Sequence, residues 1–346
     1  MDVSFVIPTL NAEALLRRCL ASIRRQTVPD GTYEILVADG GSTDGTRDVA
    51  RELGARVLDN PDRLAEAGKQ RAFDAAQGRY LALVDADNEV AGPDWLATVL
   101  RGLERHPEAL GFESTYLPHP EHTALNRYLT GLLQISDPYA RSIAEPLTLE
   151  RRDDDGIELY RLPASGGYPT GANGFVFDRE RLDEVAWRHG YHEAAFFPEL
   201  MRAGRRTLVK ARGPSIGIHH HYVASWRDYL AKRRYAMILY MLRKEETRQT
   251  WDGAGLGRRK LGALAYHLTL VPPLVEGVGR AVSDRNADWL LHPAASAVSS
   301  LGNLLGIAEY HLRSGRASRR QSAIRRHRHP EAGHPRASGT SKEMDP

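Results

Sequence analysis

The stretch YLALVDADNEV, residues 80–90, changes character in its middle. Four of its first five residues are large and apolar, which suits a strand that is buried on both faces of a sheet. Asp85 and Asp87 then follow one residue apart, with Asn88 and Glu89 behind them. We interpret the stretch as a central strand that presents carboxylates at its carboxyl end, which is where ligands bind in open α/β sheets.

Strand and helix patterns alternate on the amino-terminal side of this stretch and continue beyond it. This order is typical of a mostly parallel sheet with helical crossovers, and it predicts an α/β fold. The expected elements are strands at 3–7, 33–38, 56–58 and 80–84, and helices at 12–26, 43–53, 62–76 and 92–107.

The second half of the chain is less regular. Residues 137–170 are rich in charge, proline and glycine, and we predict a long loop or insertion there. Strands are also expected near 175–178 and at 207–210. From residue 226 the pattern becomes helical, with apolar segments at 261–279 and 287–310 that are too interrupted for a membrane-spanning helix. We expect amphipathic helices that pack on the body, on a second subunit or in the membrane interface.

Composition and charge limit the class of protein. The 346 residues are 42% hydrophobic and 26% charged, which is typical of soluble globular proteins. Cys19 is the single cysteine, so no internal disulfide can form, and the N-terminus shows no secretion signal. These features favour a cytoplasmic protein.

The charge is unevenly distributed along the chain. Residues 313–346 contain nine Arg or Lys and three Asp or Glu, whereas the whole chain carries only +3. This basic tail has few large apolar residues and is predicted to be disordered. A solvated extension and a contact with anionic lipid or nucleic acid are the alternatives, and no nucleic-acid partner is expected for the protein as a whole.

Two carboxylates that faced a polyphosphate would repel it, so Asp85 and Asp87 suggest a divalent cation between them. Mg²⁺ and Mn²⁺ prefer oxygen ligands and commonly bridge a carboxylate to a phosphate. A plain polar turn at the end of a strand is the alternative.

A second polar turn, VADGGSTDGT at residues 37–46, follows another expected strand. Its glycines Gly40 and Gly41 let the backbone approach a ligand closely, and Asp39 could accept hydrogen bonds from a base or ribose. The turn matches neither the dinucleotide-binding pattern nor the phosphate loop with its lysine, so both of those functions lose support.

Together these blocks resemble the inverting family 2 glycosyltransferases with the GT-A fold. The resemblance covers residues 1–222 and rests on four blocks in order: FVIPTLNAEALLRRCLASIRRQT (5–27), EILVADGGSTDGT (34–46), AGKQRAFDAAQGRYLALVDADN (67–88) and GANGFVFDRERL (171–182). It implies a GT-A domain at 1–222, a helical region at 223–312 and the basic tail at 313–346. It also implies a nucleoside-diphosphate sugar donor, a hydroxyl acceptor and Mn²⁺ or Mg²⁺.

Site residues follow from the resemblance position by position. Asp87 would bind the metal, and Asp85 would contact the ribose or sugar of the donor. Asp39 matches the first acid of the family's Asp-Asp-Gly-Ser turn, whose second acid is Gly40 here. The loop at residues 171–173 would face the acceptor. The full set of nucleotide and acceptor residues is Pro8, Thr9, Glu13, Asp39, Lys69, Arg71, Asp85, Asp87, Gly171, Ala172 and Asn173.

The family often carries Glu-Asp before an Arg-Ala-Gly turn, and here HEAAFFPELMRAG (192–204) occupies that region. Glu193 would be the catalytic base, with semi-apolar surroundings that raise its pKa. Glu199 and His192 are the alternatives. A histidine before the C-terminal helix can complete the metal site in such enzymes, and the spacing to Ser225 favours His220 among the three consecutive histidines at 219–221.

The sequence therefore predicts a metal-dependent inverting transferase, with UDP-sugars favoured and an acceptor in envelope or lipid-linked glycan synthesis. Aromatic and basic residues interleave in 226–246, which favours peripheral contact at the inner face of the cell membrane; packing into a homo-oligomer is the alternative. The rival functions are a retaining transferase, a nucleotidylyltransferase and a non-catalytic binding or scaffolding protein.

Overall fold

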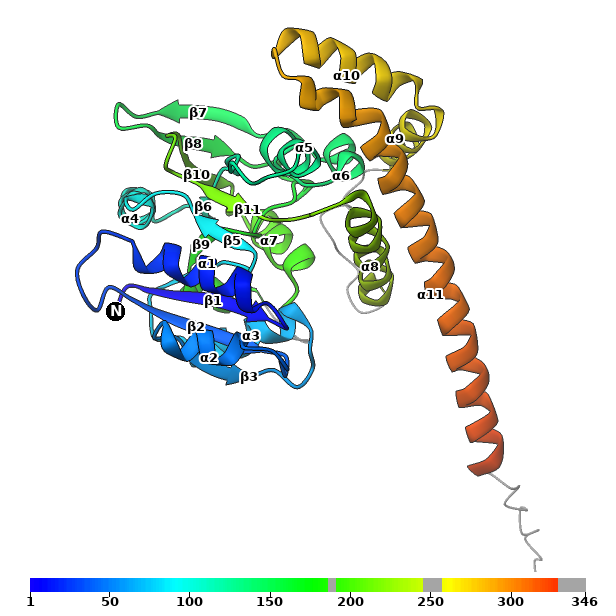
Figure 1. Cartoon of the computed structure of the whole chain (residues 1–346), viewed down its shortest axis with the longest axis horizontal. Coiled ribbons are helices and arrows are strands. Elements are labelled where there is room, and N and C mark those ends of the chain that lie inside the picture. Colours follow the sequence, from blue (N-terminus) through cyan, green and yellow to red (C-terminus); the bar gives the residue numbers. More distant parts are fainter. Residues whose placement is uncertain (186–190, 245–256, 329–346) are drawn as a thin grey trace, which may run out of the picture.

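The computed structural model describes residues 1–185, 191–244 and 257–328. It consists of an α/β body that carries helices of the C-terminal region along one side (Figure 1). The last of these helices extends well beyond the body (Figure 1).

The body is built on a nine-stranded sheet in the order β3-β2-β1-β4-β9-β6-β10-β8-β7. β1, β2, β3 and β4 run parallel, while β9 is antiparallel to both β4 and β6. The strands are β1 (Val3–Thr9), β2 (Tyr33–Asp39), β3 (Arg56–Asp59), β4 (Tyr80–Leu83), β6 (Gly111–Glu113), β7 (Thr148–Arg152), β8 (Ile157–Arg161), β9 (Phe175–Asp178) and β10 (Thr207–Ala211). β5 (Asn88–Val90) and β11 (Ile218–His220) form a separate antiparallel pair.

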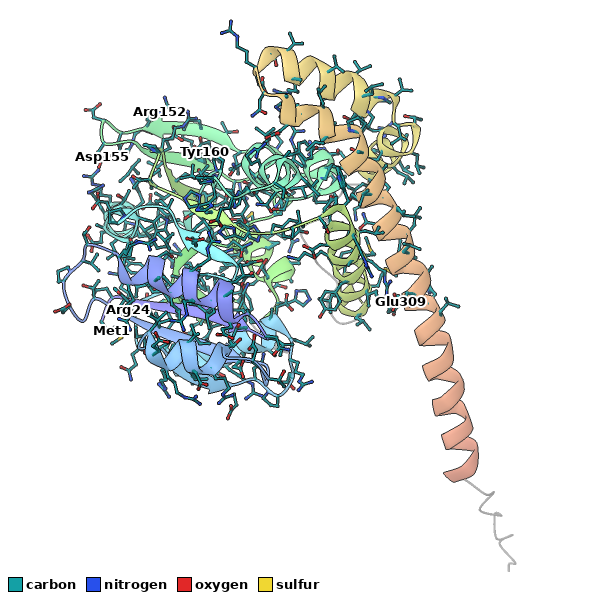
Figure 2. The ribbon with its side chains drawn as sticks, viewed as in Figure 1. Met1, Arg24, Arg152, Asp155, Tyr160 and Glu309 are labelled. Carbon is teal, nitrogen blue, oxygen red and sulfur yellow. The ribbon has the colours of Figure 1, made fainter. Side chains whose placement is uncertain are left out.

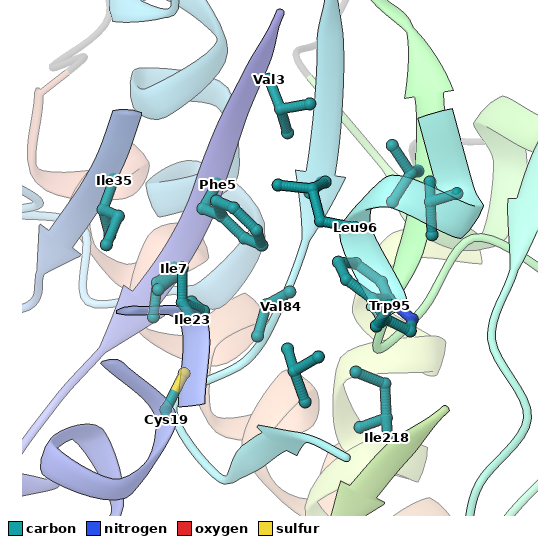
Figure 3. Packing of buried hydrophobic residues seen from close by; sticks show 14 of the residues in the cluster. Val3, Phe5, Ile7, Cys19, Ile23, Ile35, Val84, Trp95, Leu96 and Ile218 are labelled. Carbon is teal, nitrogen blue, oxygen red and sulfur yellow. The ribbon is translucent and has the colours of Figure 1, made fainter. Parts of the chain in front are cut away.

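Helices cover both faces of the sheet because its strands are apolar on both faces. Phe5 and Ile7 pack with α1 (Glu13–Arg24), α2 (Thr46–Glu52) and α4 (Trp95–Arg105), and Figure 3 shows this packing around Trp95. Val6 points the other way, to α3 (Ala65–Ala75) and α7 (Glu193–Arg202). The elements expected between residues 3 and 107 are confirmed, with ends that differ by at most three residues.

The prediction of a long loop at residues 137–170 is wrong. The segment forms α6 (Pro138–Ile143) and the hairpin of β7 and β8, which extends the sheet through β10. Ile157 and Leu159 are buried, and Glu158 between them is also buried and pairs with Arg152 at 2.6 Å. Other charged residues that suggested a loop lie at the exposed end of the hairpin, where Figure 2 labels Arg152 and Asp155.

The C-terminal region is helical, as expected. It contains α8 (Trp226–Lys244), α9 (Gly257–Thr269), α10 (Val271–Ser283), the 3₁₀ turn η4 (Ala287–Leu291) and α11 (His292–Arg328). α8 and α11 lie side by side (Figure 1), and Arg234 pairs with Glu309 across them at 2.7 Å. A third apolar cluster joins this region to the body, because Tyr128 and Leu129 of the π-helical turn η1 (Arg127–Leu132) pack with Tyr229 and Trp289.

The interrupted apolar segment 261–279 is divided between α9 and α10, which meet at an angle of 84° beside Leu270. One expectation for this region needs correction. The basic segment predicted to be disordered is helical as far as Arg328, because α11 continues through residues with good helix propensity; residues 329–346 lie outside the described part.

The sequence predicts that the segment 287–310 is too interrupted to span a membrane. By length and composition alone, Ala287–Leu312 is long and apolar enough, and α9 with α10 would pass the same test as a bent pair within the described residues. Only 39% of the apolar window in Ala287–Leu312 is buried. However, Arg233 of α8 pairs with Asp137 at 2.7 Å, and Ser299 of α11 donates to the same carboxylate, so α11 is tied to the body by buried polar contacts.

Candidate active site

The two aspartates follow β4 in a tight turn. Asn88 closes this turn: its side-chain oxygen accepts from the Asp85 N–H at 3.1 Å, and its side-chain nitrogen donates to Asp87 Oδ1 at 3.0 Å. Asn88 is fully buried, which fixes the turn and therefore the direction of both carboxylates. The aspartates thus lie at the carboxyl end of the parallel strands, as the sequence predicts.

Asp87 faces His220. His220 Nε2 lies 3.5 Å from Asp87 Oδ1, and the His221 N–H donates to the Asp87 carbonyl at 2.9 Å, because β11 runs beside β5. Lys232 of α8 approaches the other oxygen of Asp87 at 3.9 Å. Burial alone would raise the pKa of Asp87, but His220 and Lys232 outweigh burial and lower it.

Of the three consecutive histidines, His220 is the one that lies against Asp87. The other two face a separate cluster, in which His221 Nε2 contacts Glu89 at 2.6 Å and His219 packs against His119. The alternation of side chains along β11 explains this division.

The residues present fit a divalent ion that is shared with a phosphate. His220 Nδ1, Asp85 Oδ1 and Asn173 Oδ1 are buried, and none of them has a hydrogen-bond partner among the described residues. In the described part of the chain, no three His, Cys, Asp or Glu side chains form a complete metal shell. Mg²⁺ and Mn²⁺ sites often use one or two protein ligands, and substrate oxygens complete the coordination shell. Asp87 and His220 would therefore be sufficient as the ligands that the protein contributes.

Lys69 links the second aspartate to the predicted base. Its ammonium lies 2.7 Å from Glu193 Oε2 and 3.5 Å from Asp85 Oδ1, and the side chain is almost completely buried. Burial would lower the pKa of Lys69, but Asp85 and Glu193 outweigh burial and hold it well above its usual value. Three predicted site residues from distant parts of the chain therefore form one charge group around the buried Lys69 ammonium.

The surroundings of Glu193 differ from the prediction. Glu193 begins α7 and faces Lys69, whereas Phe196 and Phe197, one turn further along the helix, are buried in the core. The Glu193 carboxylate is partly exposed and pairs with a cation, so its apolar neighbours in the sequence do not enclose it.

Glu193 also lines a pocket of about 140 Å³. Ala172 and Asn173 of the predicted acceptor loop lie in its wall, while His192 and Glu199, the two alternatives for the base, do not. Gly171 lies behind the wall: its φ is +95°, and an added Cβ would meet the Phe197 ring at 1.9 Å. The position therefore requires glycine for close packing.

The floor of this pocket was missed from the sequence. Glu113, at the end of β6, accepts from Lys210 at 2.8 Å, from Tyr168 at 3.0 Å and from Thr170 at 2.5 Å. These residues come from three distant segments, and none belongs to a recognised motif. The position of Glu113 directly after a short apolar run, like that of Asp85, was the signal available.

The turn around Asp39 differs from its expected role. The Asp39 side chain has no exposed surface; it accepts from the N–H groups of Gly41 and Ser42, from the Ser42 hydroxyl and from Arg47. Burial would raise the pKa of Asp39, but these hydrogen bonds outweigh burial and lower it. The carboxylate organises the turn, and its oxygens are already occupied, which does not support the predicted contact with a base or ribose.

The remaining predicted nucleotide residues lie around the same edge of the sheet. Thr9, at the end of β1, has a buried hydroxyl that finds no hydrogen-bond partner within the described ranges, and Pro8 packs beside Gly68 of α3. Glu13 accepts from the Gly45 N–H at 3.1 Å and so joins α1 to the turn. Arg71 lies on the exposed side of α3 and pairs with Asp62 at 3.0 Å, so it is not brought to Lys69; two residues along a helix point in different directions.

Residues 4–125 match the model of glycosyl transferase family 2. A PGL/p-HBAD biosynthesis glycosyltransferase of Mycobacterium tuberculosis is 38% identical over 109 residues, which are 30% of this chain and 42% of that protein. Glycosyltransferase AglE of Haloferax volcanii is 36% identical over 92 residues, 25% of this chain and 30% of that protein. The chain thus matches less than half the length of each of these relatives.

A solved structure extends the likeness to the whole fold. A mannosyltransferase from Pyrobaculum calidifontis, in complex with GDP-Man and Mn²⁺, superposes with a TM-score of 0.52 at 17% identity, over 88% of this chain and 87% of that one. At this identity the likeness concerns the fold alone. The family match covers β1 to β4 and the Asp85–Asp87 turn, and the sheet order agrees with it. Residues 4–125 are therefore similar to glycosyl transferase family 2, and the chain has a GT-A fold.

Proposed function

We propose that this protein transfers a sugar from a nucleoside-diphosphate donor to a hydroxyl group, with inversion at the anomeric carbon and with a divalent metal. One observation carries the proposal: the pair Asp87–His220 and the group Lys69–Asp85–Glu193 meet at the carboxyl edge of the parallel strands, and Glu193 lines a pocket there. A cation-binding pair beside a carboxylate in a pocket suits displacement of a diphosphate.

Different residues act on the sugar donor and on the hydroxyl acceptor. Asp87 and His220 would hold Mn²⁺ or Mg²⁺, which when bound offsets charge on the departing diphosphate. Lys69 supplies a fixed positive charge beside Asp85, on the side where the donor enters. Asp85 orients the ribose or sugar.

Glu193 acts on the acceptor. The acceptor hydroxyl oxygen forms the new bond to the anomeric carbon, the bond from that carbon to the diphosphate oxygen breaks, and Glu193 takes the hydroxyl proton. Lys69 pairs with Glu193 at 2.7 Å and holds it in place until the acceptor arrives. Attack from the face opposite the leaving group inverts the anomeric centre.

The donor and acceptor classes extend this proposal. UDP-sugars are favoured, while Gly40 in place of an acid leaves GDP- and dTDP-sugars as alternatives; the P. calidifontis enzyme holds GDP-Man. We propose an acceptor in envelope or lipid-linked glycan synthesis and a location in the cytoplasm at the inner face of the membrane. Self-association of the C-terminal helices is the alternative to membrane contact.

The decisive experiment is calorimetric titration with UDP, GDP and dTDP, each with and without Mn²⁺. Metal-dependent binding of one nucleotide supports the proposal and identifies the donor base. Failure of all three to bind would contradict it and favour a scaffolding protein on the same fold. NMR of the product then separates inversion from retention, and release of pyrophosphate would reveal a nucleotidylyltransferase.

A further inference from the structure

The helices α9 and α10 carry their apolar side chains on the outside. The exposed fractions of these side chains range from 42% for Leu270 to 76% for Val282. They recur at intervals of three and four residues, so they form one stripe on each helix. We call them the hairpin stripe: Leu261, Leu264, Leu268, Leu270, Val271, Leu274, Val275, Val278 and Val282.

The inner faces of the same helices are small or polar. His267 is buried and contacts the Ser142 hydroxyl at 2.9 Å, and Gly277 lies so close to the Trp289 carbonyl that an added Cβ would be 2.8 Å from it. Glu276 turns inward to Tyr266 and Arg141. These inward contacts fix the rotation of both helices and turn the stripe outward.

The corner between the helices belongs to the same surface. Leu270 has a φ of +59°, a left-handed conformation that is costly for a leucine, and its side chain is not buried in return. α10 lies at the outer end of the molecule, away from the sheet (Figure 1). A contiguous apolar surface on a soluble body marks an interaction site.

We propose that this hairpin, α9 with α10, inserts its stripe into the surface of an anionic lipid bilayer. Exposed arginines flank the stripe: Arg258 and Arg259 at the start of α9, and Arg285 after the end of α10. Anionic headgroups would neutralise them, whereas a symmetric pair of copies joined through the stripe would bring the same cations together. The charges thus favour lipid over a second copy.

This inference deepens the proposed acceptor class, since a bilayer contact would bring the pocket to lipid-linked substrates. It also narrows the predicted membrane region, which comprised residues 226–246 and the apolar segments after them. α8 packs along α11 and buries Tyr229, whereas the apolar side chains of α9 and α10 are exposed on both helices. The tests below measure lipid binding and not sugar transfer. Lipid binding can therefore fail while calorimetry still shows nucleotide binding, and lipid binding can succeed while nucleotide binding fails.

The test is co-sedimentation of the full chain with vesicles of phosphatidylcholine alone or mixed with phosphatidylglycerol. We expect binding to the mixed vesicles at low salt, and at least tenfold weaker binding for the double variant Leu274→Gln/Val278→Gln. The matched control is Leu301→Gln/Leu304→Gln, which removes exposed leucines of α11 outside the hairpin and should bind as the native chain does. Both variants should keep the native melting temperature.

A label reports insertion directly. Cys19 is buried, so Val275→Cys gives one reactive thiol for an environment-sensitive fluorophore. Its emission should shift to the blue with mixed vesicles. Three outcomes would each overturn the proposal. The native protein could stay in solution, or both double variants could lose lipid binding equally. The hairpin variant could also convert a native dimer to a monomer without any effect on lipid binding.

Discussion

At the scale of single residues, the metal pair makes the sharpest prediction. Asp87→Asn keeps the size of the side chain and its contact with Asn88 but removes the charge that a cation requires. The Mn²⁺-dependent part of nucleotide binding should disappear, and transfer should fall below detection. Asp155→Asn, at the exposed tip of the β7–β8 hairpin, is the control and should bind as the native chain does. Full turnover by Asp87→Asn would exclude a metal ligand at this position.

A second prediction for a single residue concerns Glu193, the proposed catalytic base. Glu193→Gln retains the shape of the side chain but cannot accept the proton, so kcat should fall about 100-fold or more with little change in donor affinity. Glu199→Gln, on the same helix but outside the pocket wall, should keep most of its activity. Steady-state kinetics on both variants decides, because a larger loss for Glu199→Gln would reassign the base.

At the scale of elements, the turn after β2 couples stability to pH. The pKa of Asp39 is lowered in the folded chain, so its stabilising effect is complete well above the unfolded pKa of about 3.9 and is lost as pH falls through the folded value. Asp39→Asn should therefore be less stable than the native chain at pH 7, and the difference should shrink in acid. Chemical unfolding at pH 7 and near pH 3 measures it; a constant difference would mean that the charge is not involved.

The pairing of α8 with α11 depends on two glycines. An added Cβ at Gly302 would lie 2.6 Å from Arg233 Cβ, and one at Gly306 would lie 2.7 Å from the Arg234 carbonyl. Gly306→Val should lower the free energy of unfolding by about 1–3 kcal/mol through overpacking. Gly279→Ala on α10 meets nothing within 4 Å and should be neutral or stabilising by about 0.5–1 kcal/mol. Thermal unfolding of the two variants would separate packing from helix propensity, and equal melting temperatures would contradict the close contact.

At the scale of the whole molecule, the helical region and the body share one apolar cluster and the ion pair of Arg127 with Asp288 at 2.8 Å. We therefore expect one cooperative unfolding transition, with coincident curves from far-ultraviolet circular dichroism and tryptophan fluorescence. Two separated transitions would show that the predicted domains at 1–222 and 223–312 are independent. A chain cut after residue 222 should expose Tyr128 and Leu129 and bind a hydrophobic dye.

The sequence alone was sufficient for the α/β order of the first 107 residues, because hydrophobic period and polar strand ends are local properties. The residues themselves singled out Asp85 and Asp87, and the resemblance to a known family added Glu193 and His220. Lys69 was expected near the donor, but its pairing with Glu193, 124 residues away, is a tertiary contact that no local pattern carries.

Only the tertiary structure decided the rest. Residues 137–170 became sheet because β10 offered a partner for β8, and the Glu113 pocket formed because three distant segments meet there. The direction of the apolar stripes on α9 and α10 was likewise undetermined by sequence. Periodicity reveals that a helix has an apolar side, but the packing of His267 and Gly277 against the body sets that side outward.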